Sequence, residues 1–406
     1  MLQNQQFKLP LEFWHFASAK LFYTLGLRMI STIVIYQVYK LSNTYMVGLA
    51  GLTEFLPAVI AALYAGYFID NNDKKKVLKL AYVAYFFCAI FLSIVSNNAL
   101  KINNTIILYL IFIAVFCSGI FRSFASPAAS SMLAAIVSKN NLQKAISISS
   151  STYLISSIIG HASGGLLIAY LGISHAYFTS AIFLFMAFCL ASFLKPKPSF
   201  NIAQKEPMLV SIKQGFKYVW QSKILLAVLS LDLFAVLFGG AVAFIPEIAE
   251  KILHTNAIGY GFLNAAMDIG GLVSVLTLLG LPLRKKQGLK MLLAVMGFGI
   301  FIIVFGLSNV YWLSFMALIF AGLCDGISVV IRGMITQLYT PNELRGRVSS
   351  INTIFINSSN ELGQFESGLT SKLMGTVPAV LFGGTMSILI VIGTWLKFPQ
   401  IKKLEY

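Results

Sequence analysis

Charged side chains inside long apolar segments are the residues of this sequence most suited to chemistry. A carboxyl group that is partly shielded from water can alternate between charged and neutral forms near neutral pH, as a proton carrier must. Ionisable groups in membrane segments usually face a bundle interior or a wet cavity, and they often pair. The acidic residues in such segments are Glu54, Asp232, Asp268, Asp325, Glu361 and Glu366. Their basic counterparts are Lys20, Arg28, Arg122 and Arg332.

Glu361 and Glu366 belong to one segment, 348–371. At 100° per residue they lie about 140° apart on a helix, so they do not form a paired-carboxylate site. Glu366 falls in a stripe of small residues, which lets helix backbones approach closely in a membrane. We therefore interpret Glu366 as mainly structural. Glu361 lies about 20 Å from the cytoplasmic end of the segment. It is the better candidate for proton coupling, together with Glu54 and Asp268.

No constellation for catalysis is present in the sequence. His161 and Ser163 would point about 200° apart on a helix, and the Gly-Tyr-Gly at 259–261 opens an apolar segment without the last glycine of a dinucleotide motif. The four cysteines lie in apolar segments without metal-ligand spacing. We expect a protein that is not an enzyme and has no cofactor and no metal site.

The composition points to a membrane protein that crosses the bilayer many times. Of the 406 residues, 58% are hydrophobic and 11% are charged, whereas soluble domains are about a quarter charged. Apolar segments of about 20 residues predict membrane-spanning helices. The twelve predicted spans are 13–38, 45–69, 77–96, 105–126, 145–169, 176–194, 224–245, 259–280, 291–307, 311–335, 348–371 and 377–396.

The spans form two groups of six, which predicts an all-α fold of two bundles. We place the bundles at residues 1–194 and 224–406, joined by a lysine-rich linker, 195–223, whose end has the spacing of an amphipathic helix on the membrane surface. Lys and Arg total 21 on one side of the spans and 4 on the other. This bias predicts that both termini and the linker are cytoplasmic, and the scattered basic clusters do not indicate nucleic-acid binding.

The two groups also resemble each other in sequence, which indicates a parallel duplication. A shift of about 203 residues aligns 158–166 with 361–369 and sets Arg122 opposite Asp325. The fifth span of one group then matches the fifth span of the other. The paired glycine motifs contain Gly160, His161, Gly164, Gly165, Gly363, Glu366 and Gly368. His161 could titrate near pH 6.5, or could be a structural histidine satisfied by a neighbouring carbonyl.

The loop between the second and third spans, GYFIDNNDKKK, resembles the signature of the major facilitator superfamily, with Gly66, Asp70, Lys74 and Lys75 in register. The resemblance covers nearly the whole chain, and the second half is similar to the branch of bacterial enterobactin exporters and macrolide efflux pumps through residues 232–253, 340–352 and 360–368. It implies that the loop acts as a cytoplasmic gate. It also implies that the first, fourth, seventh and tenth spans line a substrate cavity, which makes Arg28, Arg122, Asp232 and Asp325 cavity candidates. The alternative for these four is structural ion pairing between helices.

The resemblance implies a secondary active transporter in the bacterial inner membrane. The leading hypothesis is a proton-antiporting exporter of a small amphipathic compound, either a siderophore or a drug-like molecule of the kind that multidrug-resistance pumps remove. Its partners would be that substrate, protons and the lipid bilayer, and we expect a monomer. An importer of a nutrient or iron chelate, a lipid flippase and an accessory membrane protein without transport activity remain as alternatives.

Overall fold

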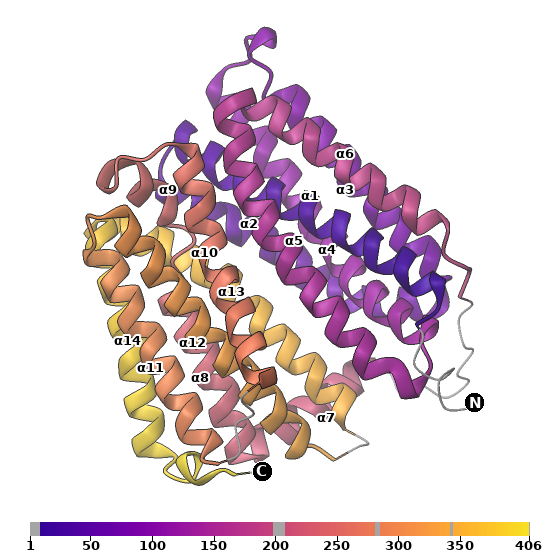
Figure 1. Cartoon of the computed structure of the whole chain (residues 1–406), viewed down its shortest axis with the longest axis vertical. Helices are drawn as coiled ribbons and strands as arrows, with labels where there is room; N and C mark the ends of the chain where they lie inside the picture. Colours follow the sequence, from indigo (N-terminus) through magenta and orange to yellow (C-terminus); the bar gives the residue numbers. More distant parts are fainter. Residues whose placement is uncertain (1–8, 198–207, 281–284, 342–343, 406) are drawn as a thin grey trace. The chain divides into compact units, whose positions relative to one another are not determined.

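The computed structural model describes residues 9–197, 208–280, 285–341 and 344–405, and within these ranges it contains helices and no strand (Figure 1). Contacts divide the chain into two compact units, each described by itself below. Unit 1 comprises Met1–Leu41 and Leu56–Ala203, and unit 2 comprises Ser42–Phe55 and Gln204–Tyr406. The first turns of α2 (Thr44–Asn71) therefore cluster with unit 2, although most of that helix belongs to unit 1.

The remaining long helices of unit 1 are α1 (Leu11–Leu41), α3 (Lys74–Val95), α4 (Asn104–Ile136), α5 (Leu142–Leu171) and α6 (Ile173–Ser192). Short 3-10 turns, Asn98–Leu100 and Lys139–Asn141, precede α4 and α5. Helix α1 packs on α5 and α6, and α3 packs on α4 and α6. One apolar cluster, with Phe16, Tyr82 and Met132 among its buried members, fills the unit between these helices.

Unit 2 begins with the amphipathic helix predicted at the end of the linker, α7 (Met208–Gln221). Its other long helices are α8 (Lys223–Gly239), α10 (Ala257–Gly280), α11 (Gln287–Leu307), α12 (Tyr311–Leu338), α13 (Arg345–Met374) and α14 (Thr376–Lys397). Between α8 and α10 lie α9 (Ile245–Glu247) and a π-helical turn, Ile248–Ile252, and a 3-10 turn, Ile401–Lys403, follows α14. Helix α8 packs on α13 and α14, and α11 packs on α12 and α14.

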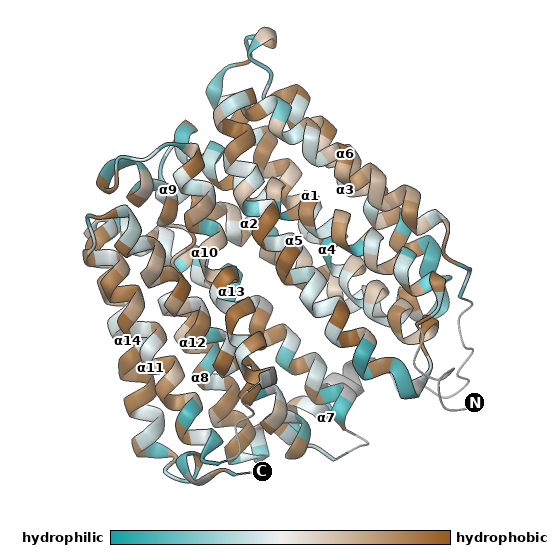
Figure 2. Ribbon diagram, viewed as in Figure 1, coloured by the Kyte–Doolittle hydropathy of each residue, from teal (hydrophilic) through white to brown (hydrophobic). Residues whose placement is uncertain are grey.

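Most of the long helices in the described residues are apolar, and brown outweighs teal along them in Figure 2. Ten are long and apolar enough to span a membrane, and the bent pair of α7 and α8 raises the number to eleven. Helix α13 overlaps the predicted span 348–371, but its many polar residues keep it below that criterion. The predicted span 224–245 was too long: α8 ends at Gly239, because Gly240 turns to an extended conformation.

The structure supports the predicted duplication through its helix ends. Helices α5 and α13 both have 30 residues, and each is followed by a glycine with positive φ, Gly172 at 81° and Gly375 at 88°. These two glycines are 203 residues apart, which is the shift found in the sequence. A left-handed residue lets the chain turn sharply into the next helix, and glycine adopts it without steric cost. The packing partners match as well, because α1 with α5 and α6 corresponds to α8 with α13 and α14.

Candidate functional site

An ion pair joins two helices deep inside unit 2. Arg332 on α12 binds the carboxylate of Asp232 on α8, and both residues are buried, with 4% and 6% of their surfaces exposed. A buried charge is costly unless it is paired, so each residue compensates the other. Asp232 is one of the cavity candidates from the sequence, and in the structure its carboxylate is paired with Arg332. Arg332 is one of the basic counterparts recognised in the sequence, but its partner was not predicted.

Two carboxylates of unit 2 have no such partner. The carboxylates of Asp325 on α12 and Glu366 on α13 have no hydrogen bond or ion pair to any residue that the structure describes, and both residues are half-buried. Asp325 lies seven residues before Arg332, which places it on the same face of α12, about 10 Å along the axis. Half-buried carboxylates without a countercharge are the groups of this unit most suited to taking up and releasing protons.

The three carboxylates predicted to couple protons differ from those of Asp325 and Glu366 in their contacts. Glu361 is 9% exposed on α13, whereas Glu54 on α2 and Asp268 on α10 are half-buried. Each of them makes at least one polar or electrostatic contact. All three cluster with unit 2, including Glu54, because residues 42–55 belong to that unit.

The glycine motif of α13 holds the helix close to two neighbours. A Cβ atom on Gly363 would lie 2.9 Å from the carbonyl oxygen of Leu237 on α8, and one on Gly368 would lie 2.8 Å from Cα of Gly48 on α2. The Ser367 hydroxyl donates to the carbonyl of Gly240 at 2.9 Å. The stripe that contains Glu366 therefore permits close helix packing, as the sequence pattern predicts.

In unit 1, polar side chains of α1 and α5 meet along one seam. Lys20 Nζ donates to Ser149 Oγ at 2.6 Å, near the beginning of both helices. Arg28 donates to the Tyr153 hydroxyl, and its guanidinium carbon lies 5.2 Å from the centre of the Tyr153 ring. The Nε atom of Arg28 is buried and has no hydrogen-bond partner among the described residues. Tyr153 was not singled out from the sequence, where nothing marks it among the 17 tyrosines.

The glycine motif of α5 lies on the same seam. A Cβ atom on Gly160 would be 2.8 Å from Cβ of Arg28, and one on Gly164 would be 3.2 Å from Cβ of Thr32. Next to them, Nδ1 of the buried His161 lies 2.6 Å from the Thr32 hydroxyl. This hydrogen bond fits the structural interpretation of the histidine. Gly165 is buried on α5, and Arg122, the fourth cavity candidate, is half-buried on α4 and makes a polar or electrostatic contact.

The gate motif ends in contacts that fasten α3 to α6. Asp73 caps α3 by accepting from the backbone N–H of Lys75, and the Lys75 ammonium donates to the carbonyl of Ser192, the last residue of α6, at 2.8 Å. A cation at a helix C-terminus is favoured by the helix dipole. Lys74 begins α3, and Gly66 and Asp70 lie in α2, where the Asp70 side chain is outside the described part.

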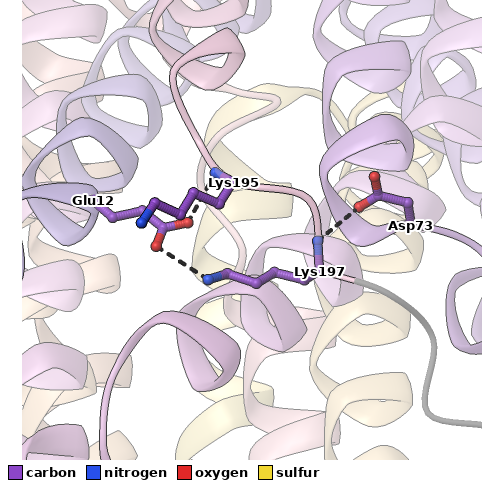
Figure 3. A network of polar contacts seen from close by, with 4 residues as sticks. All are labelled: Glu12, Asp73, Lys195 and Lys197. Atoms are coloured by element: carbon purple, nitrogen blue, oxygen red, sulfur yellow. Dashed lines mark hydrogen bonds and ion pairs between the residues drawn. The ribbon is translucent and has the colours of Figure 1, made fainter.

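The chain after α6 is held at the same end of unit 1 (Figure 3). Glu12 accepts from the Lys195 backbone N–H at 3.0 Å and pairs with the Lys197 ammonium at 3.1 Å. The Lys197 backbone N–H donates to Asp73 at 3.1 Å. These contacts tie the beginnings of α1 and α3 to the linker. Glu12 and Asp73 were not predicted as partners, because the three segments are far apart in sequence.

Charge is divided unequally between the interiors of the two units. Among Lys, Arg, Asp and Glu, the residues in the predicted spans of unit 1 are all basic: Lys20, Arg28, Lys79 and Arg122. Those of unit 2 are mostly acidic: Glu54, Asp232, Asp268, Asp325, Glu361 and Glu366, with Arg332 as the basic member. Basic groups suit recognition of an anionic or hydroxylated ligand, and carboxylates suit proton transfer.

The helices, their duplication and the charged groups within them define a helical membrane transport protein. The family model of the Major Facilitator Superfamily matches residues 16–364, and this chain belongs to that superfamily. It is thus an integral membrane protein of a transporter family and not an enzyme.

Relatives and solved structures agree with this assignment. The chain is 25% identical over 362 residues to the enterobactin exporter EntS of Shigella boydii serotype 4 (strain Sb227), covering 89% of this chain and 85% of that protein. The enterobactin exporter EntS of Escherichia coli O1:K1 / APEC gives the same values. The fold is similar to that of a D-xylose-proton symporter, with a TM-score of 0.77 at 13% identity, covering 97% and 99% of the two chains. A POT family transporter in complex with a thioalcohol conjugated peptide gives a TM-score of 0.76 at 10% identity and 96% coverage of each chain.

Proposed function

We propose that this protein is a proton-coupled exporter of a small amphipathic compound, of siderophore or drug-like type, that works by alternating access. The superfamily supports transport of a small molecule, and the name of the relatives, enterobactin exporter, supports a siderophore as cargo. We place it as a monomer in the bacterial cytoplasmic membrane with both termini in the cytoplasm, in agreement with the distribution of Lys and Arg.

The observation that carries proton coupling is the pair of uncompensated carboxylates in unit 2. Asp325 and Glu366 are half-buried, and their carboxylates have no partner among the described residues, whereas Asp232 is neutralised by Arg332. A carboxyl group that exchanges protons with the two sides of the membrane must not be locked in its charged form by a neighbouring cation. We therefore assign coupling to Asp325 and Glu366 ahead of Glu361, Glu54 and Asp268, which make other contacts.

Substrate recognition in this proposal belongs to Arg28 and Tyr153 in unit 1. Tyr153 is 37% exposed, and its partner Arg28 is half-buried in the middle of a predicted span. A guanidinium is costly against lipid, so an accessible Arg–Tyr pair at this depth is better placed on an aqueous pathway. The guanidinium can bind an anionic or hydroxylated group in a forked arrangement, and the tyrosine ring offers an aromatic surface to the rest of the ligand.

The proposal is tested with the purified protein in liposomes under an imposed pH gradient. Candidate siderophores and drug-like compounds are added, and a pH-sensitive dye in the lumen reports proton movement. Substrate-driven proton flux is expected for at least one compound. Labelled substrate in inverted and right-side-out vesicles separates an exporter from an importer. Absence of flux across a broad panel would refute proton coupling and favour a flippase or an accessory protein.

A further inference from the structure

Helix α7 runs in a different direction from α8, the helix that follows it. Its stretch Lys213–Gln221 meets α8 at an angle of 102°, and Ser222 between them caps α8 by accepting from the Leu225 N–H. Because α8 lies in a segment predicted to span the membrane, a helix at this angle to it runs nearly parallel to the membrane surface. Amphipathic helices in this orientation lie at the boundary between headgroups and acyl chains.

The inner face of α7 is fixed to unit 2. Val219 is 1% exposed and packs in a cluster with Leu225, Val348 and Ile351. A Cβ atom on Gly215 would lie 3.0 Å from the carbonyl oxygen of Arg347, which shows how closely α7 approaches the first turn of α13. The Tyr218 hydroxyl donates to the carbonyl of Tyr339, and Arg347 donates to Gln214. Helix α7 is therefore packed against α13 and the end of α12 in this unit.

The outer face of α7 combines basic and aromatic side chains. Lys213, Phe216, Lys217 and Trp220 have the i, i+3, i+4, i+7 spacing of one helical stripe, and all four are exposed. Phe216 and Trp220 are 45% and 64% exposed, and their rings stack with centres 5.9 Å apart. Tryptophan is enriched at the membrane interface, where one part of its ring is in an apolar environment and the other is hydrated.

We propose that this face binds anionic phospholipid headgroups. The lysine ammonium groups of residues 213 and 217 would pair with the anionic headgroup, and the two stacked rings would enter the level where headgroups meet acyl chains. Charge complementarity supports this occupant, because basic side chains next to a span attract anionic lipids. The exposed rings of Phe216 and Trp220 favour contact with lipid over contact with water. Aromatic side chains on the apolar stripe of an amphipathic helix are typical of a helix that lies in the membrane interface.

The test uses the full chain with Trp220 as its one tryptophan, after Trp14, Trp312 and Trp395 are replaced by Phe. The protein is placed in nanodiscs of phosphatidylcholine with a minority of phosphatidylglycerol, and either lipid carries brominated acyl chains that quench fluorescence. The expected result is quenching of Trp220 by both, with phosphatidylglycerol favoured over phosphatidylcholine beside Trp220 by a relative binding constant of up to roughly thirtyfold, the effect of two lysines at an anionic surface.

Lys213→Gln with Lys217→Gln should return quenching by phosphatidylglycerol to its mole fraction and leave quenching by phosphatidylcholine in place. The matched control is Lys285→Gln with Lys290→Gln, two exposed lysines before and within the first turn of α11, which should keep the enrichment. Quenching of Trp220 by aqueous acrylamide but not by lipid would show a solvated face and overturn the proposal. Protection of Trp220 from both quenchers would show that a protein segment covers the face and would also overturn the proposal. Enrichment of phosphatidylglycerol that persists without the two lysines would overturn it as well. None of these readouts depends on transport, so the proposed function stands or fails separately.

Discussion

Breaking the Asp232–Arg332 ion pair tests whether each of the two buried charges is stabilised by the other. Asp232→Asn leaves a guanidinium that is 4% exposed without a countercharge, and Arg332→Gln leaves a carboxylate that is 6% exposed. Removing one partner of a buried pair costs about 3–5 kcal/mol. Replacing both by apolar residues of similar volume, Asp232→Leu with Arg332→Met, is often neutral, because no charge remains to be desolvated.

The assay is reversible unfolding of the purified variants in mixed micelles, followed by circular dichroism. We expect each single variant to lose about 3–5 kcal/mol of unfolding free energy and the double variant to lose less than either of them. Lys290→Gln, at an exposed position on α11, serves as the control and should change stability by less than about 0.5 kcal/mol. Additive losses in the double variant would refute the reasoning, since they would mean that neither charge compensates the other.

Three further predictions follow from other contacts. Partial burial alone raises the pKa of the Glu247 carboxyl, but hydrogen bonds from Lys251, Thr44 and Thr376 outweigh it and lower that pKa below its ordinary value. The carboxylate thus stabilises the fold above about pH 5, and the difference in melting temperature between wild type and Glu247→Gln should vanish as the pH falls through the lowered pKa. Gly363→Ala should destabilise the protein by about 1–3 kcal/mol, because the added Cβ would press on the Leu237 carbonyl. Gly393→Ala, with open space around it, is the control and should not destabilise the protein. Melting curves would show the difference, and equal effects would contradict the α8–α13 packing. Arg28→Lys should raise the KM for transport about tenfold or more through loss of the forked donors, as initial rates of uptake would show, and an unchanged KM would remove Arg28 from the substrate pathway.

The helices and their duplication were predictable because they depend on local patterns. An apolar segment of about 20 residues has few alternatives to a spanning helix, so each predicted span overlaps a helix of the structure. The 203-residue shift also placed the glycines that end α5 and α13 opposite each other. The end of α8 was missed because residues 241–245 are as apolar as the helix before them, and only Gly239 and Gly240 signal the break.

The partners of the charged groups could not be predicted, because they come from distant parts of the chain. Asp232 and Arg332 are 100 residues apart, and nothing in either segment indicates that they meet. A helical projection predicts that Glu361 and Glu366 point in different directions, but it cannot show what each side chain faces. The seam of small residues suggested a structural role for Glu366, yet a close seam does not supply a countercharge, and in the described part of the chain Glu366 has none.

Substrate-driven proton flux through four proteins in parallel tests the central claim most directly. Wild type, Asp325→Asn, Glu366→Gln and Glu361→Gln are reconstituted at equal density in liposomes, and lumenal pH is recorded after substrate is added. We predict that Asp325→Asn and Glu366→Gln abolish proton flux while still exchanging labelled substrate, and that Glu361→Gln retains flux. Wild-type flux in both the Asp325 and the Glu366 variants would contradict the account.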